Sequence, residues 1–420
     1  MLTKGQLLTG ATGSIGAHTL ALMAASPDIR KIYCLVRGPD PNKRVLDTLA
    51  EKHLHLDASS RAKIVALAAD VSKSDFGVGS AMMRTLRDSV TLILHIAWPV
   101  NFNLPLRTFE PQLAGLQNLL RFSMSVPSAE PARLFFCSSV STAFNMSANS
   151  VVPEGPIHNL EHADRMGYAQ SKLVGEHIVL NAARAGARAY VLRIGQVVGD
   201  SQAGLWNDRE AIPSMIRSAL ALKALPRLEN RCSWLPVDTV ATAILELCQT
   251  VENEPCRRTV DAVDPPVIYN MVNPHEFAWE DLLKELNEAG LDFDIVETGA
   301  WLDMMRESAV TGDVENNPGV KLIDYYDREY GTRENASSMR AGKVVNGVTN
   351  GFSKPMVNGR SVVRRAGAAA RAQEPSGGLR FDTTLAQRDC AVLRAPPRLL
   401  EDGYIKKFVA TWLPGWMGHQ

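Results

Sequence analysis

A glycine-rich loop near the N-terminus is the feature that most constrains the fold. Thr9–Gly16 reads TGATGSIG and lies between a short apolar run and a helical pattern. In a strand–loop–helix junction, Gly10 would allow a tight turn, Gly13 the close approach of a phosphate, and Gly16 the packing of helix on strand. The junction therefore predicts a parallel α/β sheet with a dinucleotide bound at the start of the first helix. The candidate cofactor-binding residues in this loop are Gly10, Thr12, Gly13, Ser14, Ile15 and Gly16.

Short β-branched runs alternate with helical patterns over the first two thirds of the chain. The predicted strands are Gln6–Thr9, Ile32–Val36, Lys63–Ala68, Thr91–Ile96, Leu134–Cys137 and Ala189–Ile194. Several are apolar throughout, as in strands covered on both faces. Helical patterns such as Ala17–Ala25 and Gly115–Ser125 lie between them, and this alternation predicts a doubly wound parallel sheet. We expect this domain over residues 1–265.

A smaller C-terminal domain, expected to bind the substrate, is predicted over residues 266–420. Helical patterns recur at Ala278–Ala289 and Gly299–Glu307. Residues 334–378 contain seven Gly and seven Lys or Arg but few large apolar side chains, so this insertion is expected to be disordered. Near the end, an apolar residue recurs every four positions and predicts a packing helix, with a membrane or partner helix as the alternative. These residues are Leu400, Tyr404, Phe408 and Trp412.

Composition argues against several classes of partner. The chain has 45 basic and 45 acidic residues, so no net charge attracts it to nucleic acid or to an anionic membrane. No stretch reaches the roughly 18 apolar residues of a membrane span, and the start at Met1 leaves no room for a signal peptide. The six cysteines are scattered without metal-binding spacing. We expect a cytoplasmic protein with reduced thiols, no structural metal, and no nucleic-acid or membrane partner.

The end of the second predicted strand indicates which dinucleotide is bound. In NAD-dependent proteins an acidic residue near this point holds the ribose 2′-hydroxyl. This chain instead has Arg37, followed by Lys43 and Arg44. A guanidinium would pair with the 2′-phosphate that a carboxylate would repel, so the pattern favours NADPH. The alternative is a solvated arginine at a strand end.

Tyr168 and Lys172 are the candidate catalytic pair. They are four residues apart, which places both side chains on one face of a helix. A neighbouring ammonium would lower the pKa of the phenol, and the pair could then protonate a carbonyl oxygen that receives hydride. Ser139, at the end of the fifth strand, could donate to the same oxygen, with Ser138 as the alternative. No serine lies in a G-x-S-x-G sequence, which argues against a hydrolase.

Three histidines and one aromatic segment have less specific patterns. His53 and His55 are two residues apart and cannot share a helical face, so we expect both at the surface. His95 is expected to pack or to hydrogen-bond at its strand end, with a role in the substrate pocket as the alternative. Trp98–Asn103 follows directly and could form a pocket wall.

These motifs resemble those of the extended short-chain dehydrogenase/reductase superfamily, which has a Rossmann-type sheet. The loop has the GxxGxxG form found there, and Ser139, Tyr168 and Lys172 match the catalytic triad of the superfamily. The resemblance implies that Asp70 contacts adenine, that the backbone of Ala97 contacts the cofactor, and that Lys172 holds the ribose. A helix N-cap is the alternative for Asp70.

Within the superfamily, roughly residues 5–265 are similar to thioester reductases, which terminate nonribosomal peptide synthetases, polyketide synthases and carboxylic acid reductases. The similarity to fungal-type adenylate-forming reductases rests on LTGATG, CLVR, SSVST, the Tyr168 and Lys172 pair, RIGQVVGD and WLPVD. It implies NADPH-dependent release of an acyl or peptidyl group from a phosphopantetheinyl carrier protein as an aldehyde or, after a second reduction, an alcohol. No carrier or adenylation segment precedes Met1, so we expect an excised domain or a stand-alone member.

Other activities of the same fold stay open as alternatives. They include acyl-CoA, aldehyde and ketone reductases and the nucleotide-sugar epimerases or dehydratases. Sugar-nucleotide enzymes usually keep an aromatic–glycine pair where this chain has Ala143–Asn145, which argues mildly against them. A non-enzymatic protein that senses NADP would have no need of the acid that Tyr168 provides.

Overall fold

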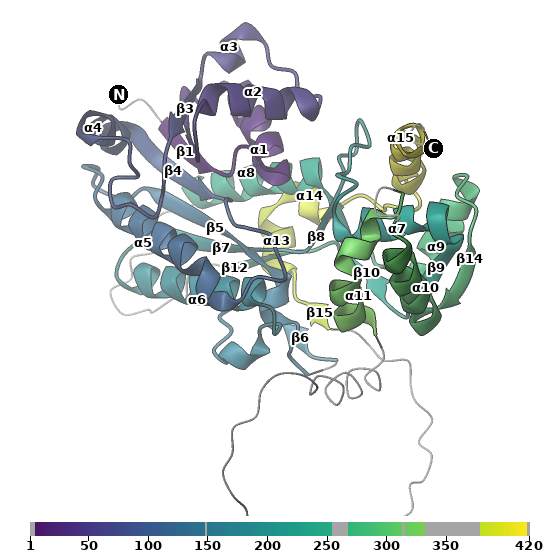
Figure 1. Cartoon of the computed structure of the whole chain (residues 1–420). Coiled ribbons are helices and arrows are strands. Elements are labelled where there is room, and N and C mark those ends of the chain that lie inside the picture. The colour runs from purple at the N-terminus through teal and green to yellow at the C-terminus, as the bar shows by residue number, and fades with distance from the viewer. Residues whose placement is uncertain (1–4, 148, 254–267, 313–315, 332–378, 418–420) are drawn as a thin grey trace, which may run out of the picture.

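A seven-stranded parallel sheet forms the centre of the computed structural model, which describes residues 5–147, 149–253, 268–312, 316–331 and 379–417 (Figure 1). The strand order is β12-β7-β5-β4-β1-β2-β3, and every neighbouring pair is parallel. The strands are β1 (Gly5–Thr9), β2 (Lys31–Val36), β3 (Ile64–Ala68), β4 (Val90–His95), β5 (Arg133–Ser139), β7 (Ala189–Ile194) and β12 (Ile268–Met271). The predicted doubly wound sheet is confirmed. From β1 the strands are added in one direction to β3 and then in the other from β4, and such sheets bind ligands at the point between β1 and β4 where this order reverses.

Helices cover both faces of the sheet because the strands carry apolar side chains on both. Along β2, Ile32 and Cys34 pack into one layer and Tyr33 and Leu35 into the other. The first layer contains α1 (Ser14–Ala25), α2 (Pro41–Glu51), α8 (Val237–Asn253), α13 (Thr384–Asp389) and α14 (Ala391–Arg394). The second contains α4 (Ser80–Ser89), α5 (Glu110–Met124) and α6 (Gly167–Arg184), and the short α3 (Ala58–Arg61) precedes β3.

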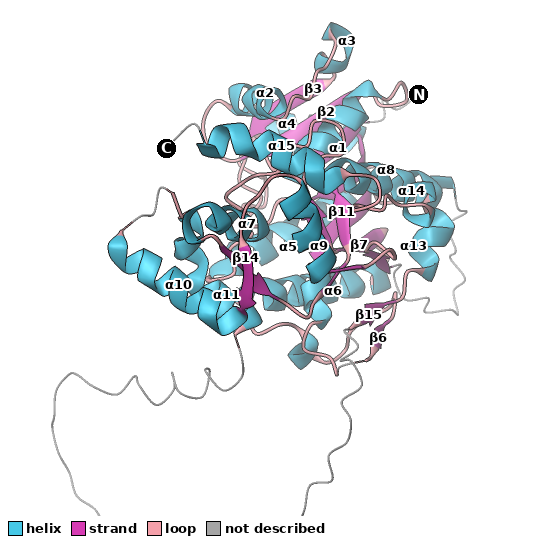
Figure 2. Cartoon of the chain, turned by 90° about the vertical axis from the view of Figure 1, so that its right-hand side faces the viewer, coloured by secondary structure: helices cyan, strands magenta, loops and turns pink. Residues whose placement is uncertain are grey.

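A second hydrophobic core lies to one side of the sheet (Figure 1, right), and Figure 2 shows its helices from the front. Its elements are α7 (Ala211–Leu222), β9 (Ala224–Arg227), α9 (Trp279–Glu288), β14 (Asp294–Glu297), α10 (Thr298–Thr311), α11 (Ile323–Tyr330) and α15 (Tyr404–Met417). In the predicted terminal helix, Phe408 and Trp412 are buried, as the packing interpretation requires. Leu400 lies outside this helix, which begins only at Tyr404.

The two cores do not divide at residue 265. Strand β12 starts at Ile268 and still belongs to the central sheet, whereas Val198 and Trp234 pack in the second core. Residues 399–416 return to that second core after α13 and α14 have packed on the sheet. The second core is therefore assembled from three separate stretches of chain.

Short elements complete the described part of the chain. The strands are β6 (Val151–Val152), β8 (Gln196–Val198), β10 (Arg231–Cys232), β11 (Trp234–Pro236), β13 (Phe277–Ala278) and β15 (Arg380–Phe381). The 3₁₀ turns are Leu106–Phe109, Val140–Ala143, Leu160–His162 and Pro318–Leu322. The predicted insertion, residues 334–378, lies outside the described residues, as does Cys256.

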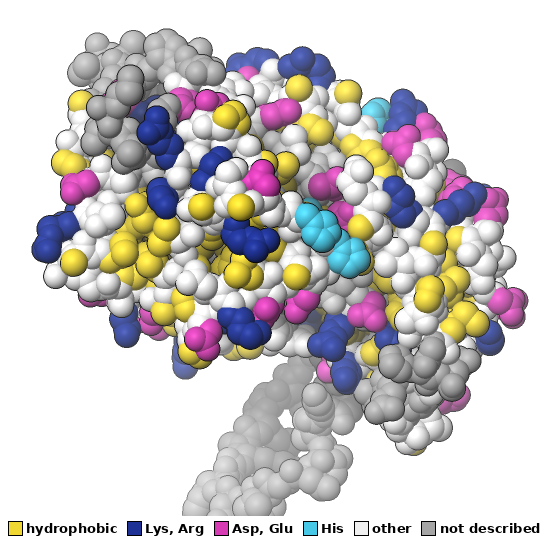
Figure 3. Space-filling view, turned by 90° about the horizontal axis from the view of Figure 1, so that it is seen from above, with side chains coloured by type: hydrophobic (Ala, Val, Ile, Leu, Met, Phe, Trp, Pro, Cys, Tyr) yellow, Lys and Arg dark blue, Asp and Glu magenta, His cyan; other side chains and the backbone are white. Residues whose placement is uncertain are grey.

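Surface and thiol features were also predicted from composition. On the face seen in Figure 3, acidic and basic side chains are interspersed, without a large field of one sign. Within the described ranges, none of the helices combines the length and the apolar character that a bilayer crossing needs. The described cysteines are free and buried; they are Cys34, Cys137, Cys232, Cys248 and Cys390. His53 and His55 are exposed.

Candidate active site

One cleft of about 2230 Å³ contains every site residue predicted from the sequence. It begins at the glycine loop, passes the ends of β4 and β5, and continues to α7, α11 and α15 of the second core. The predicted residues on its wall are Gly10, Thr12, Gly13, Ser14, Ile15, Gly16, Arg37, Asp70, Ala97, Ser139, Tyr168 and Lys172.

The glycine loop leaves the start of α1 open to the cleft. Gly10 has a φ of +86°, and a Cβ on Gly16 would lie only 2.0 Å from the carbonyl oxygen of Gly10, so both positions require glycine. At Gly13 a Cβ would meet only that same oxygen, at 3.4 Å, and no side chain caps the helix there. The free N–H groups at the start of α1 therefore suit a phosphate group, and a dinucleotide fits this loop.

Arg37 and Asp70 lie at the ends of the next two strands. Arg37 is exposed, and its carbonyl accepts a hydrogen bond from the guanidinium of Arg44. Asp70 accepts from the hydroxyl and the N–H of Ser72 at 2.6 and 3.0 Å, and these bonds lower the pKa of its carboxyl. No helix begins after Asp70, so the alternative of a helix N-cap does not apply; its carboxylate instead caps a turn.

Thr9 joins the ends of β1 and β4. Its Oγ1 accepts from the N–H of Ala97 at 3.2 Å and lies 2.8 Å from Nδ1 of His95. The N–H of Ala97 is thus occupied, so a cofactor contact from this residue would use its carbonyl. His95 is buried and stacked on Phe136, and burial, aided by the charge of Lys172, lowers the imidazole pKa to about 3. The neutral ring packs at its strand end, as predicted, and also reaches the cleft.

Ser139 is the last residue of β5 and has its hydroxyl beside Tyr168. Its Oγ accepts from the N–H and the hydroxyl of Ser141 at 3.2 and 3.0 Å, and its side chain hydrogen-bonds Tyr168. The alternative, Ser138, is buried and donates to Glu176 at 2.6 Å. Of the two serines, the structure therefore brings the hydroxyl of Ser139 to the tyrosine.

Tyr168 has a raised pKa, in contrast to the lowering predicted from its neighbour. Burial raises the pKa of the phenol to about 12, and the hydrogen bond with Ser139 only partly opposes this effect. Lys172 does not lower it, because its ammonium donates to the carbonyl of Cys137 at 2.5 Å and lies 5.8 Å from the centre of the tyrosine ring. Tyr168 is therefore a protonated phenol at neutral pH.

Lys172 lies in an aromatic and nearly closed environment. Its Nζ is 4.5 Å from the ring centre of Trp98 and 4.9 Å from that of Phe136. Burial lowers the pKa of the ammonium to about 7, with the charge of Glu176 acting in the opposite direction. An anionic ligand at this point would favour the charged form.

The far wall of the cleft combines the predicted aromatic segment with tyrosines that the sequence analysis did not identify. Phe102, from the predicted Trp98–Asn103 wall, packs edge-on against Tyr168 and stacks on Tyr325 with ring centres 5.3 Å apart. Tyr325 comes from α11, which also places Tyr330 on the cleft. The tyrosine-rich run IDYYDREY was a usable signal, but nothing in the sequence placed it beside Tyr168.

Taken together, the sheet, the glycine loop and the Ser–Tyr–Lys group define a nicotinamide-dinucleotide-binding domain of the extended short-chain dehydrogenase/reductase type. Residues 8–244 match the family described as male sterility protein, and the chain belongs to this family.

Curated relatives are much longer than this chain. The chain is 36% identical over 344 residues to adenylate-forming reductase Nps10 of Heterobasidion annosum, a match that covers 79% of this chain and 30% of the relative. It is 33% identical over 334 residues to a carboxylic acid reductase of Neurospora crassa, covering 77% of this chain and 31% of that protein. The chain thus spans about a third of the length of these relatives.

Solved structures confirm the fold. The terminal R domain from the myxalamid PKS–NRPS pathway matches with a TM-score of 0.76 at 21% identity, over 99% of this chain and 92% of that one. A thiolation–reductase di-domain from an archaeal nonribosomal peptide synthetase matches with a TM-score of 0.60 at 20% identity, over 83% and 73%.

Proposed function

We propose that this chain is an NADPH-dependent thioester reductase. It would release an acyl or peptidyl group from a phosphopantetheinyl carrier protein as an aldehyde or, after a second reduction, an alcohol. The observation that carries the proposal is the meeting of the glycine loop, Ser139, Tyr168 and Lys172 in one cleft that continues into the second core. The names of the relatives, an adenylate-forming reductase and a carboxylic acid reductase, support it.

The residues present suit the reduction of a carbonyl group. NADPH, when bound, supplies hydride to the carbonyl carbon of the thioester. Tyr168 keeps its proton until negative charge develops on the carbonyl oxygen and then donates it, while Ser139 donates a second hydrogen bond. The C–S bond of the resulting hemithioacetal then breaks, and its hydroxyl proton leaves with the thiol of the carrier as the aldehyde forms. Lys172, in its charged form, holds the ribose.

The choice of NADPH rests on the basic end of the cleft. Arg37 and Arg44 both line it, and the bond between the Arg44 guanidinium and the Arg37 carbonyl keeps the two residues together. Two guanidinium groups would favour a 2′-phosphate over a hydroxyl. In this proposal Asp70 lies near the adenine of the cofactor, and the carbonyl of Ala97 accepts a hydrogen bond from the cofactor.

The second core would bind the carrier-linked substrate. We propose that residues 266–420 act in this role together with α7, because α7, α11 and α15 all line the far part of the cleft. A solved structure of similar fold joins a thiolation domain to a reductase. We also propose that the protein acts in the cytoplasm, where NADPH and carrier proteins are available.

Product analysis tests the proposal. One acyl chain would be presented on a phosphopantetheinyl carrier, on coenzyme A and as a free aldehyde, each with NADPH. We expect aldehyde or alcohol from the carrier thioester, with the highest kcat/KM on the carrier. Equal values on the carrier and coenzyme A would favour an acyl-CoA reductase, and turnover of the aldehyde alone would reject thioester reduction.

A further inference from the structure

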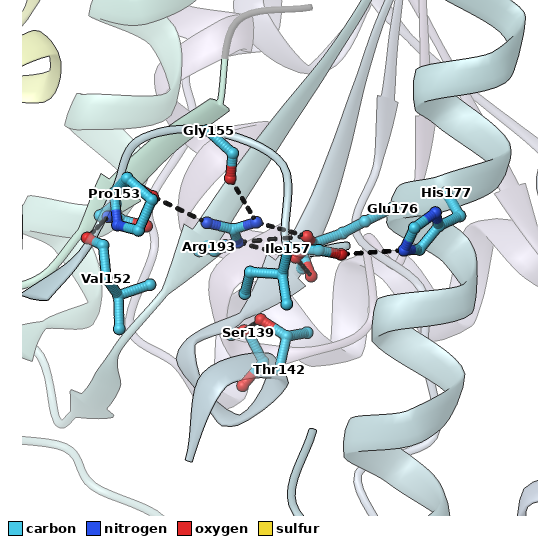
Figure 4. A network of polar contacts seen from close by, with 11 residues as sticks. Ser139, Thr142, Val152, Pro153, Gly155, Ile157, Glu176, His177 and Arg193 are labelled. Carbon is cyan, nitrogen blue, oxygen red and sulfur yellow. Dashed lines mark hydrogen bonds and ion pairs between the residues drawn. The ribbon is translucent and has the colours of Figure 1, made fainter. Parts of the chain in front are cut away.

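Glu176 and Arg193 form an ion pair that is fully buried next to the candidate catalytic residues (Figure 4). Nε and Nη2 of Arg193, on β7, donate to the carboxylate at 3.0 and 2.7 Å. Glu176 lies on α6, one turn after Lys172 and on the same helical face. A buried ion pair must offset the cost of desolvating two charges, so stability alone is a weak reason for its presence.

Two hydrogen bonds join this face of α6 to consecutive residues of β5. Lys172 donates to the carbonyl of Cys137 at 2.5 Å, and the hydroxyl of Ser138 donates to Glu176 at 2.6 Å. The next residue of the strand is Ser139. Successive side chains of a strand point to opposite sides, so fixing the side chain of Ser138 also fixes the direction of Ser139.

Arg193 extends the same network to the loop after β6. Its Nη1 donates to the carbonyl of Pro153 at 3.1 Å and its Nη2 to that of Gly155 at 2.9 Å. Next to Glu176 on α6, His177 contacts the carbonyl of Ile157 at 2.9 Å through Nε2 (Figure 4). The guanidinium thus has acceptors on two sides and holds the carboxylate of Glu176 in one orientation.

We propose that Glu176, oriented by Arg193, is a positioning residue that acts through Ser138 to place the hydroxyl of Ser139 against Tyr168. This inference rests on the proposed carbonyl reduction. The network touches neither the glycine loop nor the far wall of the cleft, so it should act mainly on the chemical step. Its one link to cofactor binding is the charge of Glu176, which favours the charged form of Lys172. A displacement of about 1 Å between reacting groups can cost up to about 10²-fold in rate.

The test is a double-mutant cycle on Ser138→Ala and Glu176→Gln. Each single variant should lower kcat at saturating NADPH about 10- to 100-fold. The Kd for NADPH should stay unchanged in Ser138→Ala, whereas Glu176→Gln also removes a charge that favours the charged form of Lys172 and should weaken NADPH binding. The double variant should be no slower than either single variant, because both changes interrupt one connection. Ser138→Thr, which restores a hydroxyl, should recover the rate. Ser123→Ala is the control, since Ser123 is also buried but its hydroxyl donates to the carbonyl of Leu120 within its own helix.

The possible outcomes separate this inference from the proposed function. If the wild type reduces the thioester and Ser138→Ala has the same kcat as the Ser123→Ala control, the positioning role alone would be overturned. Rate losses that multiply in the double variant would also overturn it, because Ser138 would then act independently of Glu176. If Glu176→Gln does not fold, the apolar pair Glu176→Leu with Arg193→Met takes its place in the cycle. A wild type that reduces neither thioester nor aldehyde would overturn the proposed function and this role together.

Discussion

Burial sets the protonation of Tyr168, the residue from which the proposed reaction takes its proton. Its pKa of about 12 keeps the phenol protonated across the working range. Tyr168→Phe should therefore retain the fold and NADPH binding but lose roughly 10²–10⁴-fold in kcat. Tyr33→Phe is the matched control, since Tyr33 is buried on β2 away from the cleft. Near-normal turnover by Tyr168→Phe in a steady-state assay would reject the assignment.

Lys172 should give the reaction its pH dependence. Its pKa of about 7 lies below the ordinary value, so the ammonium loses its proton as the pH rises through about 7. The groups facing it are neutral His95, the Cys137 thiol with its raised pKa, and the carboxylate of Glu176. We expect kcat/KM to fall above about pH 7 because the charged form holds the ribose. In Lys172→Arg, which stays charged, this fall should disappear; a flat wild-type profile from pH 6 to about 9 would contradict the account.

Arg37 should control the choice of dinucleotide. Arg37→Ala removes a charge-assisted contact worth about 1.5–3 kcal/mol, so the Kd for NADPH should rise about 10- to 150-fold while NADH is barely affected. Arg87→Ala is the control, because Arg87 is an exposed arginine of α4 outside the cleft. Titration calorimetry with both dinucleotides measures the difference. Equal use of NADH and NADPH by the wild type would show that Arg37 does not select between the two dinucleotides.

At the scale of elements, two glycines at the junction of β1 and α1 should have different roles: Gly16 is needed for packing, and Gly13 for binding of the cofactor. Gly16→Ala places a Cβ 2.0 Å from a backbone carbonyl and should cost more than about 2 kcal/mol in the free energy of unfolding. Gly13→Ala meets only an ordinary contact at 3.4 Å, so the melting temperature should hardly change while NADPH binding weakens. Thermal melts and cofactor titrations of both variants check this. Similar melting temperatures for the two would refute the packing argument.

The sequence predicted the elements whose pattern is local. The six predicted strands all occur within two residues of their predicted bounds, since runs such as Ile32–Val36 are apolar on both faces. Strand β12 was missed because Ile268–Met271 is only four residues long and lies beyond the predicted boundary. The pKa of Tyr168 was predicted in the wrong direction, because burial depends on packing that its spacing from Lys172 does not reveal.

At the scale of the whole molecule, the two cores are interleaved along the chain. The second core combines residues from Val198 to Trp234 with α9–α11 and α15, so no single boundary could be read from composition. This arrangement places α7 and α11 opposite the glycine loop in one cleft. The cleft is therefore built from both cores, and neither core alone supplies all of its lining.

Reduction of a carrier-bound thioester is the most direct test of the account. Wild type and Tyr168→Phe would be incubated with NADPH and an acyl-phosphopantetheinyl carrier, and products and carrier analysed by mass spectrometry. The account predicts aldehyde or alcohol together with free carrier thiol for the wild type, and at least about 10²-fold less for Tyr168→Phe. An intact acyl-carrier with bound NADPH, or equal product from both proteins, would contradict it.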